Sequence, residues 1–372
     1  MKGWQAWGIS ASIAIDQAAA AMYYAASRAY FSDRLGEESY RFMLLLSAAE
    51  ALPGIAGPLL GLLGDVRGAR TLLLLSSLRG FLLPLIVYTP SMGAVGLVAL
   101  VGLLSTLFSA AAVGSLLRAS GGSAARYAKL SILFPIAWAV GGLIPAPVVE
   151  RFGYPQLFLL MGALYSLSSL LGALFAENSF GNGKVGAALR ALPLRPLLGL
   201  ALFSAGLTLF FSMIAVKLYR ELGNDLLLFG FVGVSLTSLL SALARPLAGL
   251  VVEKVGEERA LLLVVIAYSL YGISLYLAGG FLLALLWLLP FYPFKDVAQA
   301  VYVSRRLPME LQATAAGILT MIYSLSSVAN LIAYPVLEEE SLGRGLLIML
   351  LLSLISFLLI RSGGASPRGG SS

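Results

Sequence analysis

The chain of 372 residues contains neither cysteine nor histidine, and only 12% of its residues are charged. Without cysteine, disulfides, thiol nucleophiles and thiolate metal sites are excluded. Without histidine, the commonest metal ligand and the usual proton relay near neutral pH are missing as well. Soluble domains carry about 25% charged residues, so this composition argues against a cytosolic enzyme, a nucleic-acid-binding protein and a disordered chain. We therefore expect no metal, no cofactor and no nucleic-acid partner.

The chain is instead rich in apolar sequence, with 59% hydrophobic residues and a mean hydropathy of +0.91. It also has 40 glycines and 16 prolines, which transmembrane helices tolerate better than soluble helices do. At roughly 20 residues per span plus short loops, the length allows about twelve transmembrane helices. The first apolar segment is too long for the core of a signal peptide, so we expect it to be retained. The predicted spans are residues 4–30, 40–63, 71–88, 93–117, 130–149, 154–176, 195–216, 226–252, 260–278, 281–304, 313–337 and 345–360.

A polar stretch rich in small residues divides these spans into two sets of six. Residues 177–194 (ENSFGNGKVGAALRALPL) are the only long interruption of this kind. We predict that they link an N-terminal bundle, 1–176, to a C-terminal bundle, 195–372, which ends in a short flexible tail. The predicted fold is therefore an all-α membrane protein of twelve helices in two pseudo-symmetric six-helix bundles.

The basic residues indicate how the chain is oriented in the membrane. Cytoplasmic loops carry an excess of lysine and arginine, and most of these residues fall on one set of loops if the N-terminus is inside. Acidic residues lean towards the other set. We predict a multi-pass protein of the plasma membrane, with both termini and the linker in the cytoplasm. The inside set includes Lys2, Arg67, Arg70, Arg118, Lys184, Arg245, Arg305, Arg306 and Arg361.

An internal repeat supports the division into halves. Gly61, Asp65 and Gly68 follow the second span, and the same pattern recurs 188 residues later, after the eighth span. At the same offset, Arg118 at the end of the fourth span corresponds to Arg306 just past the tenth. Matches at a fixed offset of about half the chain length indicate a duplication. The counterparts of the first three residues are Gly249, Glu253 and Gly256.

These residues carry a resemblance to a known family. The segment GLLGDVRGAR, 61–70, resembles the cytoplasmic loop signature of the major facilitator superfamily, glycine-x-leucine-x-aspartate-x-x-glycine-x-arginine. The segment AWAVGGLIPAP, 137–147, resembles the family's fifth span, and PMELQATAAG, 308–317, resembles the start of its eleventh. The resemblance covers nearly the whole chain. It implies a secondary transporter whose two halves rock about a central site.

By this resemblance, Asp65 stabilises the outward-open state by joining the two halves at the cytoplasmic side. We expect its carboxylate near the first N–H groups of the eleventh span, because a helix N-terminus attracts negative charge. Arg118 is expected to pair with the same carboxylate. Glu253 and Arg306 are expected to form a weaker counterpart around the start of the fifth span. The alternative is that these gate residues are solvated loop residues, and for Arg306 alone we prefer it. The predicted gate residues are Gly61, Asp65, Gly68, Arg70, Arg118, Gly249, Glu253, Gly256, Arg259 and Arg306.

Polar and ionisable residues within the spans form the second group of candidates, because a charge near the bilayer centre costs a few kcal/mol. Asp16 lies about 18 Å along the first span, near mid-membrane. Glu50 and Arg79 belong to the second and third spans. Lys295 and Asp296 follow a proline break in the tenth, and as neighbours they project about 100° apart on a helix. The predicted substrate and proton-coupling residues are Asp16, Gln17, Tyr23, Glu50, Arg79, Tyr292, Lys295 and Asp296.

Two interpretations of these charges stay open. A carboxylate in the membrane suits proton coupling, because desolvation favours its protonated form, and without histidine the carboxylates are the natural proton carriers. Alternatively, Arg79 neutralises Asp16 or Glu50 in a buried ion pair that only fixes helix packing.

The sequence favours a monomeric secondary active transporter in the lipid bilayer, moving a small-molecule substrate by alternating access. We prefer proton-coupled efflux of an amphipathic or cationic compound, because Asp16 and Glu50 are acidic. The alternative is proton-coupled uptake of a sugar or an anionic metabolite, with Arg79 and Lys295 as ligands of the anion. A membrane-embedded enzyme is disfavoured by the missing nucleophile and metal motifs, and a channel by the two-half repeat.

Overall fold

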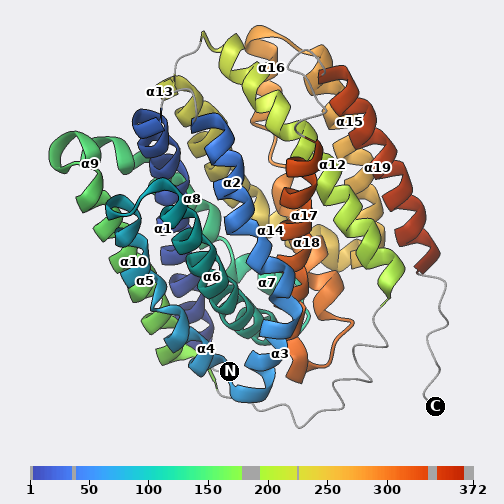
Figure 1. The fold of residues 1–372 in the computed structure, drawn as a ribbon. Coiled ribbons are helices and arrows are strands. Elements are labelled where there is room, and N and C mark those ends of the chain that lie inside the picture. Colours follow the sequence, from blue (N-terminus) through green and yellow to red (C-terminus); the bar gives the residue numbers. More distant parts are fainter. Residues whose placement is uncertain (1–2, 36–38, 178–192, 224–225, 334–341, 364–372) are drawn as a thin grey trace.

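The computed structural model describes residues 3–35, 39–177, 193–223, 226–333 and 342–363, and its regular structure in these ranges is entirely helical (Figure 1). The N-terminal half contains α1 (Gly3–Leu35), α2 (Ser39–Ala51), η2 (Leu52–Ala56), α3 (Gly57–Arg67), α4 (Ala69–Ser76), α5 (Arg79–Leu82), η3 (Leu83–Tyr88), α6 (Ser91–Ser120), α7 (Ala124–Leu130), α8 (Leu133–Leu143), α9 (Pro145–Phe152) and α10 (Tyr154–Phe175). The C-terminal half contains α12 (Leu194–Glu221), α13 (Leu226–Phe229), η4 (Gly230–Leu236), α14 (Thr237–Val255), α15 (Glu257–Leu277), α16 (Gly280–Trp287), α17 (Tyr292–Ser304), η5 (Met309–Leu311), α18 (Gln312–Ala333) and α19 (Leu342–Gly363).

Eleven helical stretches in the described ranges are long and apolar enough to cross a membrane. The more polar α1 is a further long helix, packed against α8 and α10. The predicted all-α fold of twelve long helices is thereby confirmed. Residues 178–192 and 364–372, most of the predicted linker and tail, lie outside the described ranges, so the division of the chain at 177–194 stays a prediction.

Several helix ends differ from the predicted spans. α1 continues to Leu35, α12 to Glu221 and α19 to Gly363, beyond the predicted ends at residues 30, 216 and 360. A transmembrane helix can continue into the polar headgroup region, where hydropathy no longer marks it. Residues 334–337, the predicted end of the eleventh span, lie outside the described ranges.

Five spans are interrupted rather than continuous: the second, third, fifth, eighth and tenth. Most of the interruptions contain proline, which removes a backbone donor and clashes with the preceding turn; examples are Pro53, Pro84, Pro145 and Pro290. The eighth span instead contains a π-helical segment, η4, between α13 and α14. Such wide turns are frequent at functional sites, and the irregular tenth span lies beside this one in the C-terminal half.

The repeat is visible in the backbone. Gly68 joins α3 to α4 with a φ of 90°, and Gly256 joins α14 to α15 with a φ of 89°. A residue with a side chain rarely adopts such a φ, so both turns require glycine. We call the end of the molecule with these turns the signature end; the turn between α3 and α4 lies at the lower end of Figure 1.

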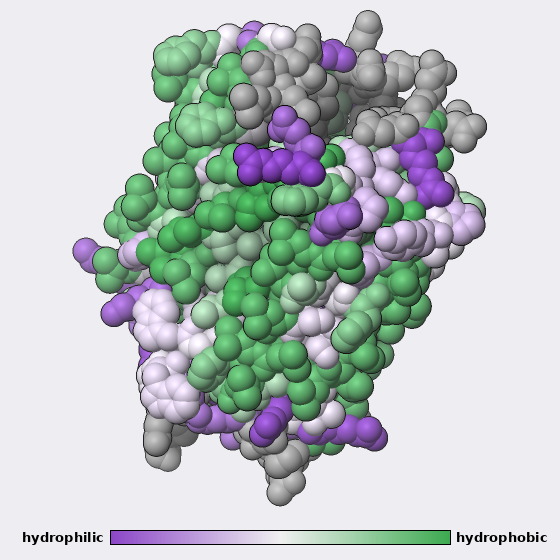
Figure 2. Space-filling model, turned by 90° about the vertical axis from the view of Figure 1, so that its left-hand side faces the viewer, coloured by the Kyte–Doolittle hydropathy of each residue, from purple (hydrophilic) through white to green (hydrophobic). Residues whose placement is uncertain are grey.

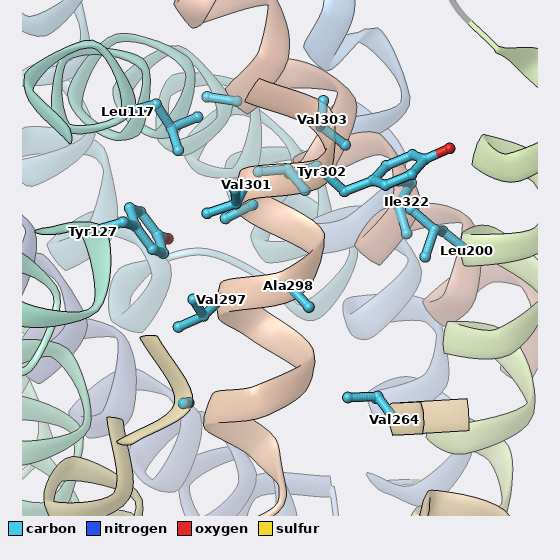
Figure 3. Packing of buried hydrophobic residues seen from close by; sticks show 14 of the residues in the cluster. Leu117, Tyr127, Leu200, Val264, Val297, Ala298, Val301, Tyr302, Val303 and Ile322 are labelled. Carbon is cyan, nitrogen blue, oxygen red and sulfur yellow. The ribbon is translucent and has the colours of Figure 1, made fainter. Parts of the chain in front are cut away.

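The buried core joins the two halves at the signature end. One continuous cluster draws residues from α6 and α7 of the N-terminal half and from α12, α17 and α18 of the C-terminal half. Figure 3 shows α17 between them, with Val297 and Val301 pointing towards Tyr127 and with Tyr302 pointing away, towards Leu200. The second cluster belongs to the N-terminal half alone. The halves are therefore closed on each other at this end.

The outer surface is apolar, as a bilayer requires. Figure 2 shows a broad hydrophobic area across the middle of one face, with hydrophilic residues mostly towards its upper and lower margins. Large side chains such as Phe81, Leu243 and Leu277 are at least 70% exposed. In a membrane these side chains contact lipid, so their exposure needs no partner protein.

Candidate transport site and gates

A buried ion pair lies in the middle of the N-terminal half. Arg79, at the start of α5, contacts the Asp16 carboxylate of α1 at 2.5 Å. The Arg79 side chain is fully enclosed, whereas 12% of the Asp16 side chain is exposed. The guanidinium lies 4.3 Å from the ring centre of Phe108 and 4.5 Å from that of Tyr165, an arrangement that stabilises a desolvated cation. Its remaining hydrogen bonds, at 3.2–3.3 Å, go to the hydroxyls of Ser105, Ser168 and Ser169.

The other predicted residues of this half lie around the pair rather than in it. Glu50, on α2, is half-buried, and its charge acts on Tyr165. Gln17 follows Asp16 but is turned to another side of α1, where it is half-buried. Tyr23 is buried, and its ring packs edge-on against Phe158. The structure therefore brings together Asp16 and Arg79, with Glu50 nearby.

A second ion pair lies within the C-terminal half, and its arginine also contacts the N-terminal half. Arg245, on α14, pairs with Asp296 of α17. Arg245 also donates a hydrogen bond of 2.6 Å to the hydroxyl of Ser131, and its guanidinium lies 5.6 Å from the ring centre of Phe134, both in the N-terminal half. The Tyr323 hydroxyl donates to the other oxygen of Asp296 at 3.5 Å.

Sequence reasoning missed Arg245, because it was counted with the arginines of the inside loops. The structure corrects this: Arg245 lies within α14 and is 2% exposed. The signal was available, since Arg245 lies seven residues before the end of the apolar segment 226–252. An arginine at that depth carries the same burial cost as the other ionisable residues within the predicted spans.

Lys295 projects away from its neighbour Asp296, into the C-terminal bundle. It lies in the wall of an open cavity of about 260 Å³ between α12, α14, α15, α16 and α17. Its Nζ is 5.3 Å from the ring centre of Tyr323. Tyr292, one turn away on α17, lines the same cavity. The aromatic residues of the wall are Phe211, Tyr268, Tyr271, Trp287, Phe291 and Tyr292.

At the signature end, Asp65 connects α3 to the start of α18. Its carboxylate is fully buried and accepts hydrogen bonds from the N–H groups of Ala313 (3.1 Å) and Thr314 (2.8 Å) and from the Thr314 hydroxyl (2.7 Å). The first N–H groups of a helix have no partner within the helix, so a carboxylate there satisfies them. Arg118 reaches the same carboxylate at 3.4 Å and donates to the Met309 carbonyl at 3.0 Å.

Glu253, on α14 of the C-terminal half, has the related position and faces the start of α7 in the N-terminal half. It accepts a hydrogen bond of 2.6 Å from the Ala124 N–H, but 42% of its side chain is exposed. Its arginine is Arg305 (3.5 Å) rather than the expected Arg306. Arg305 also donates to the Gly122 carbonyl at 2.8 Å and so holds the N-terminal half.

The other gate arginines do not join the halves in the described structure. Arg306 stacks on Tyr302, with 3.4 Å between the guanidinium carbon and the ring centre, and pairs with Glu257 and Glu258 of its own half. Arg70 and Arg259, the last residues of the two signatures, are exposed.

Two signature glycines lie where the halves touch backbone to backbone. A side chain at Gly61 would collide with the backbone of Ala313 in α18, and one at Gly249 would collide with Ala124 and Ala128 of α7. These glycines therefore allow the close approach that brings Asp65 and Glu253 to the facing helix starts.

Comparison with known proteins agrees with this geometry. The model of the Major Facilitator Superfamily matches residues 9–330. The chain belongs to the major facilitator superfamily. No curated protein matches it in sequence. Among solved structures, it is similar to the human organic anion transporter MFSD10 (TETRAN), with 16% sequence identity, a TM-score of 0.69, and coverage of 95% of this chain and 98% of that one; at this identity, the likeness concerns the fold.

Membership of the major facilitator superfamily makes the protein a multi-pass membrane transporter of the secondary type and not an enzyme. Proteins of this family bind a small-molecule substrate within the membrane. The residues described above are therefore the candidates for substrate binding, coupling and gating.

The unequal burial of Asp65 and Glu253 leads to a first prediction. Asp65→Asn removes a buried charge that accepts three hydrogen bonds from α18 and one from Arg118. Bonds to charged groups are worth about 1.5–3 kcal/mol each, so the closed population should fall at least about tenfold. Glu253→Gln removes a half-exposed charge worth about 0–1 kcal/mol and should have a much smaller effect. Spin labels on cysteines introduced at Arg67 and Glu310 measure the opening, because the chain has no cysteine of its own. Equal distances between the two labels in both variants would contradict the larger contribution of Asp65 to the closed state.

Proposed function

We propose that this transporter is driven by a proton gradient and that Asp16 is the carboxylate that takes up and releases the proton. The observation that carries the proposal is the geometry of the Asp16–Arg79 pair, in which the arginine is fully enclosed and the aspartate retains 12% exposure. A proton can therefore reach the carboxylate while the guanidinium stays in place.

Protonation of Asp16 would uncouple α1 from α5 without unfolding the site. The guanidinium would keep its aromatic faces, Phe108 and Tyr165, and its serine hydroxyls. It would lose the attraction that binds α1 to α5. Protonation that changes the contacts of one conformational state more than those of another shifts the populations of the two states. Asp296 is a second candidate, because its pair with Arg245 also contacts the N-terminal half.

The same proposal assigns sides to the molecule. The signature end faces the cytoplasm, as the basic loops predict, in a plasma-membrane protein with both termini inside. The contacts of Asp65, Glu253 and Arg305 then close the protein towards the cytoplasm. Substrate would reach the central region from the opposite side in this state.

Asp16→Asn tests the proposal. Because asparagine keeps an acceptor oxygen for Arg79 but cannot exchange a proton, accumulation of substrate driven by a pH gradient in proteoliposomes should fall to background. Counterflow, which needs no proton, should continue and would show that the variant is folded. Glu150→Gln is the matched control, because Glu150 is exposed on α9. Gradient-driven accumulation at the wild-type level in Asp16→Asn would overturn the role of Asp16.

A further inference from the structure

We propose that the cavity between α12, α14, α15, α16 and α17 is a substrate-binding cavity of the C-terminal half, and that its ligand is an amphipathic organic anion with an aromatic or other ring body. The proposal rests on the transport function and adds a location and a chemical class to it. It favours the anionic one of the two substrate classes that the sequence leaves open.

The walls of the cavity form one connected cluster of rings. Phe211 lies 5.6–5.9 Å, between ring centres, from Tyr268, Tyr271 and Trp287. Phe291 closes the cluster at 4.8 Å from Tyr271. Ligand pockets are typically lined by such apolar and aromatic side chains, with a few polar groups that orient the ligand.

Hydrogen bonds hold this wall in place before any ligand binds. Pro290 has no N–H to offer the carbonyl of Leu286, and the Tyr271 hydroxyl donates to that carbonyl at 3.0 Å. The indole N–H of Trp287 donates to the Gly233 carbonyl at 3.1 Å, which ties the wall to the π-helical segment η4. The two irregular spans are thus joined around the cavity, so the cost of ordering the wall is met before binding.

Lys295 supplies the charge that selects the ligand. Among the described residues, no carboxylate pairs with it and no acceptor takes a hydrogen bond from its Nζ. Asp296 does not neutralise it by direct contact, because that carboxylate is held by Arg245 and Tyr323. A desolvated ammonium without a counter-ion is costly, and an anionic group of a ligand would complete the pair.

The cationic alternative is disfavoured by the same residue. Aromatic faces alone attract cations, so the rings by themselves would fit either substrate class. A ligand cation among these rings would lie beside the Lys295 ammonium, and like charges repel each other more strongly where water is excluded. Lys295 therefore favours an anionic ligand over a cationic one.

The depth of the cavity in the membrane suits a transport protein, and its volume limits the ligand to a small molecule. Lys295 lies nine residues before the end of α17, about 14 Å along the helix and so near the bilayer midplane. The cavity volume of about 260 Å³ is just below the range of roughly 300–1,000 Å³ for drug-sized ligands. It suits a one- or two-ring body with one acidic group. Ser241, buried in the wall, adds a hydroxyl beside the rings.

The test is calorimetric titration of the purified full chain with naphthoate, its neutral analogue naphthamide and the cation naphthylmethylammonium. Naphthoate should bind at least about tenfold more tightly than naphthamide, because a charge-assisted hydrogen bond to Lys295 distinguishes them. Lys295→Met should remove that advantage and leave naphthamide binding unchanged. Lys295→Arg should retain most of it. Thr208→Leu should weaken both ligands by filling the cavity from α12.

The outcomes separate this inference from the proposed coupling. Asp16→Asn should bind naphthoate like the wild type, since Asp16 lies in the other half and no gradient is present. Equal affinities for naphthoate and naphthamide, tightest binding of the cation, no binding of any probe, or unchanged naphthoate binding in Lys295→Met would each overturn the anion site. Loss of pH-driven accumulation in Asp16→Asn alone supports coupling and does not bear on the cavity.

Discussion

In the Arg79→Met protein, the free energy of unfolding is expected to be about 3–5 kcal/mol lower than in the wild type, because removing one partner of a buried ion pair leaves the other uncompensated. Methionine can fill the space between Phe108 and Tyr165, so the loss is electrostatic rather than a cavity. Three serine hydroxyls would also lose their donor. The midpoint of unfolding by denaturing detergent measures the change.

Two further variants isolate the pair. Adding Asp16→Asn to Arg79→Met should restore most of the lost stability, since no charge is then buried alone. Arg70→Met, at an exposed arginine of the signature loop, should change the free energy of unfolding by less than about 0.5 kcal/mol. An Arg79→Met protein as stable as the wild type would mean that Asp16 finds another partner or carries no charge.

Gly61→Leu is expected to abolish transport, because the signature end can no longer close. Overpacking a core with flexible neighbours costs about 1–3 kcal/mol. Here the obstacle is the backbone of Ala313, so the closed population should fall by at least about tenfold. Counterflow measures the transport, and labels introduced at residues 67 and 310 measure the separation of α3 from the start of α18.

Gly96→Leu is the matched control for this substitution. Gly96 also lies within a helix, α6, but no atom lies within 4 Å of a side chain placed there. Both substitutions replace glycine by a better helix former, so a change in helix propensity cannot explain a difference. Normal counterflow in Gly61→Leu would show that α3 and α18 do not need to approach as closely as they do here.

The sequence predicted the parts of this molecule that depend on local pattern and repetition. Hydropathy predicted the spans, and the fixed offset of 188 residues predicted that Gly68 and Gly256 are equivalent; the structure places both in turns with a positive φ. The helical angle between adjacent residues separated Lys295 from Asp296, and the two residues do face different surroundings in the structure.

Partners far apart in the chain could not be predicted in the same way. The sequence suggested that Arg79 neutralises Asp16 or Glu50, but only the folded N-terminal half, which brings the Arg79 side chain to α1, selects Asp16. Glu253 is reached by Arg305, the first residue after the end of α17, rather than by the expected Arg306. The cavity lay beyond sequence reasoning, because it is formed by side chains from five helices.

The difference in burial between Asp65 and Glu253 also determines how the signature end responds to ionic strength. Dissolved ions screen charges that water can reach and leave enclosed ones nearly unaffected. Salt should therefore weaken the contact of Glu253 with Arg305, where the side chains are 42% and 32% exposed, and spare Asp65, which is fully enclosed. With one contact loosened and the other intact, the halves would part first between α7 and α14 and last between α3 and α18. The opening would thus proceed in a fixed order, with the contact at Asp65 acting as the hinge between the halves.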